Sequence, residues 1–259
     1  MQDETGTALI TGASAGLGKT FARQLAAKGY QLVLVARNKE KLSQLAAELE
    51  SDFGTACELL PADLSQPRAP REIFETLQQR GIHVDYLVNN AGAAGPELLC
   101  GIDWAEHQAF YQLMMLSIAE LCDLFIPPMR ERGHGRVINV ASMAGRTARA
   151  GGCNYGPSKA WVIALSEELA LTVAADGVKV SALCPGFTHT EFHERAGLMD
   201  MKNAMPKWLW YDADVVVREG IAAVERGRAV YPSGRLYRWL DPLFQSVFLR
   251  PLFRVKDGR

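Results

Sequence analysis

The sequence has only five cysteines, and no two of them form a C-x-x-C pair. An odd and dispersed set of this kind predicts reduced thiols in the cytoplasm, and it argues against a disulfide framework or a zinc site. The chain also has no N-x-S/T sequon, and its acidic N-terminus has too few apolar residues for a signal peptide. We therefore expect a cytoplasmic protein.

The chain has no large excess of charge of either sign. Its formal net charge is −1 and its pI is near 6.5, so we expect no basic surface for nucleic acid. Hydrophobic residues make up 48% of the chain and charged residues 22%, which is typical of a globular protein with a sizeable core. No Gly/Ser/Pro-rich linker and no internal repeat interrupts the sequence, so residues 1–259 are predicted to form a single domain.

Metal-binding patterns are sparse. His189 and His193 lie four residues apart in "HTEFH", a spacing that a helix would bring to one face. The order differs from H-E-x-x-H, and no third ligand is obvious in the sequence. We therefore expect no metal site.

Apolar, β-branched runs alternate with amphipathic segments of helix length along the chain. Strands are expected at 8–11, 32–36, 58–64, 84–92, 136–142, 179–186 and 228–232, and helices at about 17–29, 39–50, 70–80, 104–132, 153–175 and 213–226. Repeated β-α-β units with uniformly apolar strands predict a parallel sheet covered by helices on both faces. The expected fold class is therefore α/β, a doubly wound Rossmann-type domain with about seven strands.

A glycine-rich turn, "TGASAGLG", joins the first expected strand to the first helix. Its glycines Gly12, Gly16 and Gly18 would let the backbone turn sharply and approach a pyrophosphate at the helix N-terminus. The spacing G-x-x-x-G-x-G differs from the commoner G-x-G-x-x-G, and a purely structural tight turn is the alternative. The position at the first β–α turn favours a dinucleotide.

The end of the second strand indicates which dinucleotide. An acidic residue there would hydrogen-bond the adenosine ribose hydroxyls of NAD, but this chain has Ala36 followed by Arg37. An arginine can pair with the 2′-phosphate of NADP instead, so we expect NADP, with NAD less favoured. The alternative is that Arg37 is a solvated loop charge.

The stretch "NYGPSKA" places Tyr155 and Lys159 four residues apart, on one face of a helix. A cation within about 4–6 Å of a phenol favours the phenolate and lowers its pKa, so the pair could act in proton transfer. The plainer interpretation is a surface tyrosine and a surface lysine at that spacing by chance.

Taken together, these motifs resemble the short-chain dehydrogenase/reductase family from about Thr7 to Tyr231. The matching motifs, in order, are the T-G-x-x-x-G-x-G turn at Thr11–Gly18, Asp63 with Leu64 after the third strand, N-N-A-G at Asn89–Gly92, a serine at Ser142, Y-x-x-x-K at Tyr155 and Lys159, and P-G at Pro185 and Gly186 followed by Thr188 and Thr190. Ser142 precedes Tyr155 by thirteen residues, the separation usual in that family.

The resemblance implies an oxidoreductase that transfers a hydride between NAD(P) and a carbonyl/alcohol pair. It implies Ser142, Tyr155 and Lys159 as catalytic residues, with Tyr155 as general acid/base. With Arg37, the implied cofactor-binding set is Gly12, Ser14, Gly16, Leu17, Gly18, Asp63, Leu64, Asn90, Ala91, Gly92, Tyr155, Lys159, Pro185, Gly186, Thr188 and Thr190. It also implies a homodimer or homotetramer through the helices at 104–132 and 153–175.

The sequence departs from the family pattern at one position. Family members commonly carry an Asn in the fourth helix that anchors a relay water, and the corresponding residue here is Met114. This places the proton relay in question, though not the hydride chemistry. The alternative function is therefore a dinucleotide-binding sensor or scaffold with little turnover.

Two segments are rich in large apolar side chains. In 187–211, the substrate-loop region in the family, these are Phe187, Phe192, Leu198, Met199, Met201, Met205, Trp208, Leu209, Trp210 and Tyr211. They predict either a lid over a hydrophobic carbonyl or alcohol, or packing on the core or another subunit. The C-terminal extension 234–259 is also apolar, but Pro242, Pro251 and internal charges argue against a membrane span, and membrane contact is not expected.

Overall fold

Seven parallel strands form one sheet in the computed structural model, which describes residues 6–151, 153–192 and 205–249. Its order is β3-β2-β1-β4-β5-β6-β9. The strands are β1 (Thr7–Thr11), β2 (Gln31–Ala36), β3 (Cys57–Pro61), β4 (Val84–Asn89), β5 (Gly135–Val140), β6 (Val178–Cys184) and β9 (Val230–Pro232). The strand order reverses between β1 and β4, where such sheets open a crevice at their carboxyl ends. The predicted doubly wound Rossmann-type class is confirmed.

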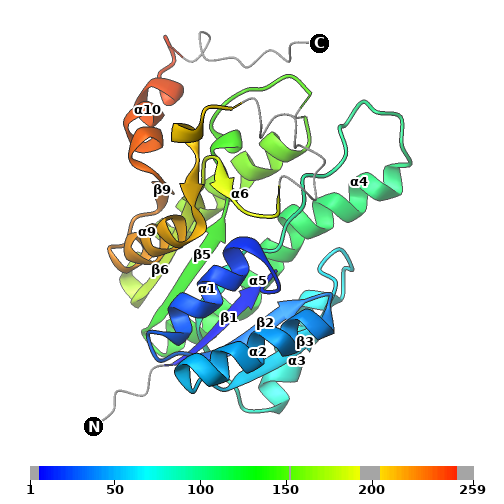
Figure 1. Cartoon of the computed structure of the whole chain (residues 1–259), viewed down its shortest axis with the longest axis vertical. Coiled ribbons are helices and arrows are strands. Elements are labelled where there is room, and N and C mark those ends of the chain that lie inside the picture. Colours follow the sequence, from blue (N-terminus) through cyan, green and yellow to red (C-terminus); the bar gives the residue numbers. More distant parts are fainter. Residues whose placement is uncertain (1–5, 152, 193–204, 250–259) are drawn as a thin grey trace.

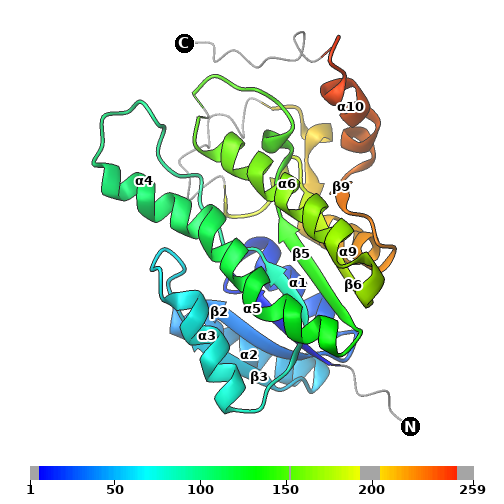
Figure 2. The same ribbon diagram turned by 180° about the vertical axis from the view of Figure 1, so that it is seen from behind.

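Helices cover both faces of the sheet (Figures 1 and 2). On one face lie α1 (Gly16–Ala26), α2 (Lys39–Phe53) and α9 (Ala213–Glu225); on the other lie α3 (Ala69–Gln79), α5 (Ser117–Glu131) and α6 (Tyr155–Thr172). Each face has its own cluster of buried apolar side chains, because the strands present Val, Ile and Leu to both sides. The sheet is thereby a rigid base for the loops at its carboxyl edge.

The long helix before β5 is not α-helical throughout. It consists of α4 (Trp104–Tyr111), the π-helical turn η1 (Gln112–Leu116) and α5, and the N–H of Ser117 bonds the carbonyl of Gln112, five residues earlier. By length and composition, the 28-residue helix Trp104–Glu131 could cross a membrane. However, 56% of its most apolar 18-residue stretch is buried inside the protein. This burial is typical of a helix that packs against the core of its own domain.

The C-terminal extension forms a helix that the sequence did not predict, α10 (Arg235–Gln245), with Pro242 inside it. A two-stranded sheet, β7 (Thr188–His189) and β8 (Tyr211–Asp212), closes the base of the substrate-loop region. Leu198, Met199, Met201 and His193 lie outside the described residues, as does 250–259 of the extension. Among the described residues, the remaining elements are 3-10 turns: η2 (Met143–Gly145), η3 (Ala174–Asp176) and η4 (Lys207–Leu209).

Candidate active site

The glycine turn between β1 and α1 is shaped for close approach of a ligand. Gly12 and Gly16 have φ of 64° and 52°, in the left-handed region that only glycine adopts readily. A Cβ on Gly18 would lie 2.1 Å from the carbonyl oxygen of Gly12, so no side chain fits there. The three glycines therefore stand where the turn requires them, and the structure brings Ser14 and Leu17 to the same turn.

The N-terminus of α1 is open. Its N-cap, Ala15, has no side chain that could accept a hydrogen bond, and the first turn carries no acidic residue. The first N–H groups of a helix have no intrahelical partner and carry a partial positive charge. This turn therefore fits the pyrophosphate of a dinucleotide.

Asn90 fastens the glycine turn to the neighbouring strand. Its side-chain amide donates to the carbonyls of Thr11 (2.9 Å) and Gly12 (3.3 Å), and its backbone N–H donates to the hydroxyl of Thr11 (2.9 Å). The N–H of Ala91 donates to that hydroxyl too (3.0 Å). Because these bonds take Asn90 out of the ladder, β4 ends at Asn89 and not at 92 as predicted.

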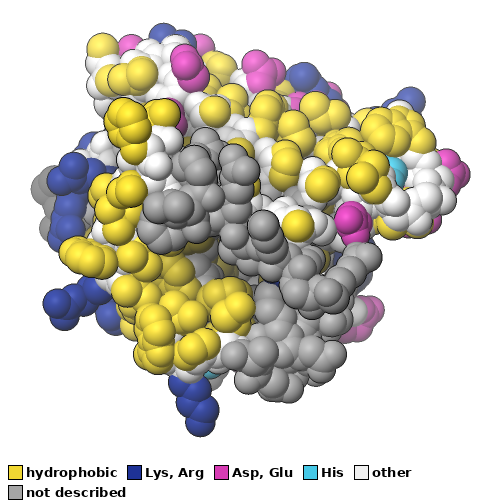
Figure 3. Space-filling model, turned by 90° about the horizontal axis from the view of Figure 1, so that it is seen from above, with side chains coloured by type: hydrophobic (Ala, Val, Ile, Leu, Met, Phe, Trp, Pro, Cys, Tyr) yellow, Lys and Arg dark blue, Asp and Glu magenta, His cyan; other side chains and the backbone are white. Residues whose placement is uncertain are grey.

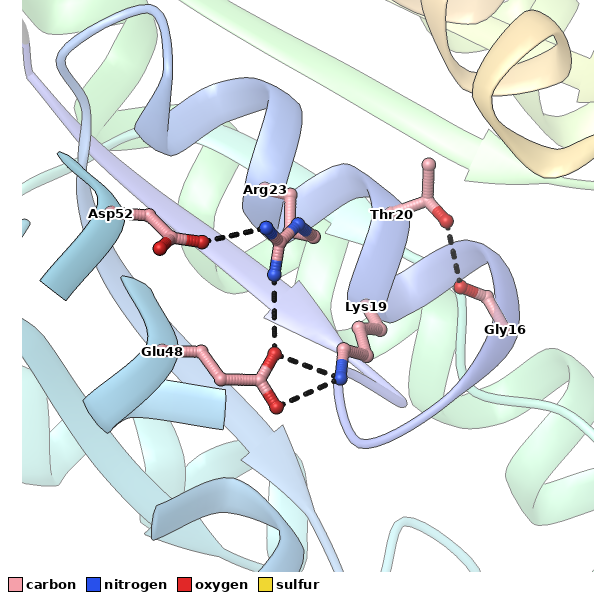
Figure 4. Close-up of polar contacts among 6 residues, drawn as sticks. All are labelled: Gly16, Lys19, Thr20, Arg23, Glu48 and Asp52. Atoms are coloured by element: carbon pink, nitrogen blue, oxygen red, sulfur yellow. Dashed lines mark hydrogen bonds and ion pairs between the residues drawn. The ribbon is translucent and has the colours of Figure 1, made fainter. Parts of the chain in front are cut away.

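A surface ion-pair network joins α1 to α2 (Figure 4). The carboxylate of Glu48 accepts from Lys19 (2.9 Å) and from Arg23 (3.1 Å), and Arg23 also pairs with Asp52 (2.6 Å). Such partly exposed pairs add little stability each. Lys19 is close to the glycine turn but is paired with Glu48 in this structure. The predicted preference for NADP over NAD therefore rests on Arg37.

Arg37, Asp63 and Leu64, which were predicted to contact the nucleotide, follow the strands β2 and β3. Arg37 is exposed directly after β2, and Asn38 beside it caps α2 by accepting from the N–H of Lys41 (2.7 Å). Asp63 accepts from the N–H and the hydroxyl of Ser65, at 3.0 and 2.8 Å. The side chain of Leu64 is buried in the core, so it is not available to a ligand.

Ser142, Tyr155 and Lys159 meet at the carboxyl end of β5. Ser142 caps the turn η2 by accepting from the N–H of Ala144 (3.1 Å), and Tyr155 is the first residue of α6. A Cβ on Gly145 would lie 2.6 Å from the backbone of Ala160, so η2 rests directly on α6. This close packing places Ser142 near enough to the hydroxyl of Tyr155 to influence its pKa.

Lys159 is almost completely buried, and its ammonium lies 5.8 Å from the centre of the Tyr155 ring. It donates to the carbonyl oxygen of Val140 (2.7 Å). Burial lowers the pKa of Lys159 to about 8, because the charged form loses its hydration. At neutral pH the side chain remains largely a cation.

The pKa of Tyr155 differs from the sequence-based expectation. Burial raises the pKa of this phenol, and the hydrogen bond from Ser142 opposes the rise. The predicted lowering by Lys159 is not seen among the groups that shift it. The phenol therefore holds its proton at neutral pH, as a proton donor must.

Met114 occupies the π-helical turn η1 and is fully buried. Its sulfur accepts from the N–H of Ala93 (3.3 Å), and a Cβ on Gly92 would lie 3.3 Å from that sulfur. The thioether thus packs under the N-N-A-G turn, where an Asn was expected from the family pattern. π-turns within helices are frequent at functional sites.

The segment after β6 closes the crevice from the other side. The carbonyl of Pro185 accepts from the N–H of Met143 (2.9 Å), which joins this segment to η2. The hydroxyl of Thr188 is buried and donates to the carbonyl of Gly186 (3.1 Å). Thr190 lies against Gly16, 3.4 Å from the position of a Cβ there, so the predicted residues of the two sides face each other across the crevice.

Sequence reasoning missed a residue beside Tyr155. Asn154 is 1% exposed and directly precedes α6, although its side chain makes no capping hydrogen bond to that helix. Its amide donates to the carbonyl of Pro96 (2.8 Å) and to Nδ1 of His107 (2.9 Å), and its oxygen accepts from the hydroxyl of Tyr111 (2.6 Å). It therefore ties α4 and the loop before it to Tyr155, and its adjacency to Tyr155 was the only signal in the sequence.

The described apolar residues of the substrate-loop region divide between packing and exposure. Trp210 is buried and contacts the rings of Phe187 and His189, each at 5.2 Å, whereas Trp208 is 67% exposed. The ring of Phe192 lies 5.8 Å from that of Tyr155. Seen from above, hydrophobic side chains gather in patches on this face of the molecule (Figure 3).

Metal ligands do not cluster in the described part of the chain: no group of three or more His, Cys, Asp or Glu side chains could hold an ion there. The ring of His189 is stacked on Trp210. All five cysteines are unpaired.

The short chain dehydrogenase family model matches residues 6–200. The ketoacyl reductase HetN of Nostoc sp. is 33% identical, and the alignment covers 97% of this chain and 94% of that protein. Two solved structures are also similar. A short-chain dehydrogenase from Sphingobium yanoikuyae in complex with NADPH is 32% identical, with a TM-score of 0.82 and 90% of each chain covered. The bulky-bulky ketone specific alcohol dehydrogenase from Comamonas testosteroni is 26% identical, with a TM-score of 0.77, covering 95% of this chain and 94% of that one.

The chain belongs to the short-chain dehydrogenase/reductase family. It is an NAD(P)-dependent oxidoreductase that interconverts a carbonyl and an alcohol, as the sequence predicted.

Proposed function

We propose that the protein is an NADP-dependent reductase or dehydrogenase of a hydrophobic carbonyl/alcohol pair, with Ser142, Tyr155 and Lys159 as its catalytic residues. The observation that carries the proposal is the meeting of these three side chains at the carboxyl end of β5, facing the glycine turn of β1. When bound, NADPH supplies the hydride.

The residues of this chain supply the proton and the orientation. The hydroxyl of Tyr155 donates its proton to the substrate oxygen as the alkoxide develops, and Ser142 donates a hydrogen bond to the same oxygen. The cation of Lys159 then stabilises the phenolate that remains. The raised pKa of Tyr155 keeps the acid protonated until that moment.

NADP preference is supported by Arg37, which follows β2 where an NAD-specific site would have a carboxylate, and by the NADPH complex of the Sphingobium relative. A hydrophobic substrate is supported by the packing of Phe192 against Tyr155 and by the bulky ketones of the Comamonas relative. The unpaired cysteines support a cytoplasmic location, and the family resemblance supports a homodimer or homotetramer.

The test is consumption of NADPH against a panel of ketones and aldehydes of increasing apolar size, with short polar carbonyls as controls. We expect kcat/KM to rise with apolar size and to be higher with NADPH than with NADH. A preference for small polar carbonyls would contradict the substrate class, and a preference for NADH would contradict the cofactor. Firm NADPH binding without turnover would favour the alternative, a dinucleotide-binding sensor or scaffold.

A further inference from the structure

The two ends of the substrate-loop region meet at one hydroxyl group. Tyr237, in α10, accepts a hydrogen bond from the N–H of Phe187 (3.1 Å) and donates one to the carbonyl of Leu209 (2.9 Å). Phe187 is the first residue of the region, and Leu209 stands near its end. A single side chain from the C-terminal extension thus bridges both stems of the loop.

The ring of Tyr237 is held as firmly as its hydroxyl. Tyr237 is 7% exposed and belongs to the main apolar cluster. A Cβ on Gly186 would lie 2.0 Å from the ring, so the ring can occupy this position only if residue 186 is glycine. The ring of Tyr211, at the end of the loop region, lies 5.8 Å away, and its hydroxyl accepts from the N–H of Leu236 (3.2 Å).

The helix that carries Tyr237 is itself anchored to the catalytic side of the crevice. Asp241 forms a two-pronged, mostly buried ion pair with Arg146, which directly follows the η2 turn that Ser142 caps. Gln245 donates to the carbonyl of Arg146 (3.1 Å), so a second side chain of α10 holds the same residue. A bidentate pair of this kind fixes orientation as well as distance.

At its other end α10 is held to α9. Glu219 accepts from the guanidinium of Arg238 (2.8 Å) and from the N–H of Gly234 (2.7 Å). With both ends fixed, α10 presents the Tyr237 hydroxyl at one position relative to Ser142 and Tyr155.

We infer that α10 is a brace for the substrate loop and that Tyr237 is a positioning residue for substrate binding. The inference rests on the proposed function, since the loop it braces carries Thr188, Thr190 and Phe192 into the crevice. The hydroxyl of Tyr237 sets where the loop leaves and rejoins the sheet, and so sets the pocket before substrate arrives. Its loss should weaken substrate binding more than it slows the chemical step, because the proton donor and its partners lie on β5 and α6.

The test is the full-length Tyr237→Phe variant, which keeps the ring and removes the hydroxyl. The matched control is Tyr86→Phe, because the hydroxyl of Tyr86 is buried with no hydrogen-bond partner among the described residues. The first readout is hydrogen exchange of the Phe187 amide, which needs no substrate. We expect it to exchange about 10-fold faster or more in Tyr237→Phe and to be unchanged in the control.

The second readout is steady-state kinetics with the best carbonyl of the panel. We expect KM to rise by about 3- to 10-fold with kcat within about twofold of the wild type, and neither to change in Tyr86→Phe. An unchanged exchange rate of the Phe187 amide in Tyr237→Phe would refute the inference that this hydroxyl holds the substrate loop. Faster exchange with unchanged KM, or a fall in kcat at constant KM, would overturn the positioning role. If no carbonyl turns over in the wild type, the proposed function has failed, and amide exchange alone still decides whether the brace exists.

Discussion

The two sides of the crevice are built from different materials. On the nucleotide side, the ligand-facing groups are the backbone of one turn of eight residues, Thr11–Gly18, and the open end of α1. The substrate side, which carries Ser142, Tyr155 and Lys159, is instead assembled from segments far apart in the chain, held by contacts such as Tyr237 to Phe187, 50 residues apart, and Arg146 to Asp241, 95 residues apart. The glycine turn would recognise the pyrophosphate, which all dinucleotides share. The other side depends on separate side-chain contacts, each of which can be altered by a single substitution.

The largest expected effect is a loss of turnover when the proton donor on the substrate side is removed. Tyr155→Phe keeps the ring and removes the proton donor, so kcat should fall by about 10²- to 10⁴-fold. NADPH affinity, measured by titration, should stay within about threefold of the wild type, because the Tyr155 hydroxyl is only one of many predicted cofactor contacts and the others remain. Near-normal turnover in this variant would refute the assignment of Tyr155.

The next prediction concerns the side chain that adds selectivity to the nucleotide side. Arg37→Asp should weaken NADPH binding by about 10- to 100-fold, since a charge-assisted hydrogen bond contributes about 1.5–3 kcal/mol and the new carboxylate repels the 2′-phosphate. NADH binding should be unchanged or tighter. Arg226→Asp, an exposed charge change at the far end of α9, is the control and should leave both affinities unaltered. Equal losses for the two cofactors would show that Arg37 does not read the phosphate.

Lys159 gives a pH-dependent prediction for the cofactor-free protein. Its folded pKa of about 8 lies below the ordinary value of 10.5, so in this interval the unfolded chain binds more protons than the folded one. The stability of the wild type relative to Lys159→Gln should therefore rise with pH from about 8 to 10.5, by up to about 3 kcal/mol. Chemical denaturation at several pH values measures the difference in the free energy of unfolding between the two proteins. Titration of the cysteines contributes equally to both proteins and therefore cancels in this difference. The same comparison with the exposed Lys28→Gln should be flat, and a flat result for Lys159 would disprove its burial as a cation.

The smallest expected effect is at Met114, beneath the boundary between the two sides. Met114→Asn should lower stability by about 1–3 kcal/mol, because it buries an amide in place of a thioether. It should leave kcat unchanged or raised and reduce its solvent isotope effect, since an amide there can hold a relay water. Met114→Leu is the control: it removes the sulfur without adding an amide and should cost less than about 1.5 kcal/mol. A fall in kcat shared by both variants would mean that packing, not proton relay, matters at this position.

The same contrast explains which parts could be predicted from the sequence. The glycine turn and the spacing of Tyr155 and Lys159 are local patterns, because each depends on φ angles or helical periodicity within a few residues. The parallel sheet covered by helices was predicted from the repeated β-α-β units, which are also local patterns.

What sequence reasoning missed depends on partners far along the chain. No helix was predicted for the extension, yet α10 is present there, where Asp241 pairs with Arg146 and Tyr237 bonds Phe187. Asn154 is an ordinary polar residue until Tyr111 and His107 are placed beside it. The pKa of Tyr155 is raised where a lowering was expected, because the phenol is buried, and the sequence does not show burial.

The π-helical turn η1 has a consequence for how this chain can vary. Each residue of an α-helix advances the helix by about 100°, so the additional residue held in η1 sets the rotational phase between α4 and α5. With this phase, α5 lays its apolar face on the sheet while His107 and Tyr111 of α4 point at Asn154. Deleting one residue of η1 would restore a regular α-helix but turn α4 away from Asn154. We therefore expect a change of length inside this helix to disturb the start of α6, because the helix links the sheet to Asn154.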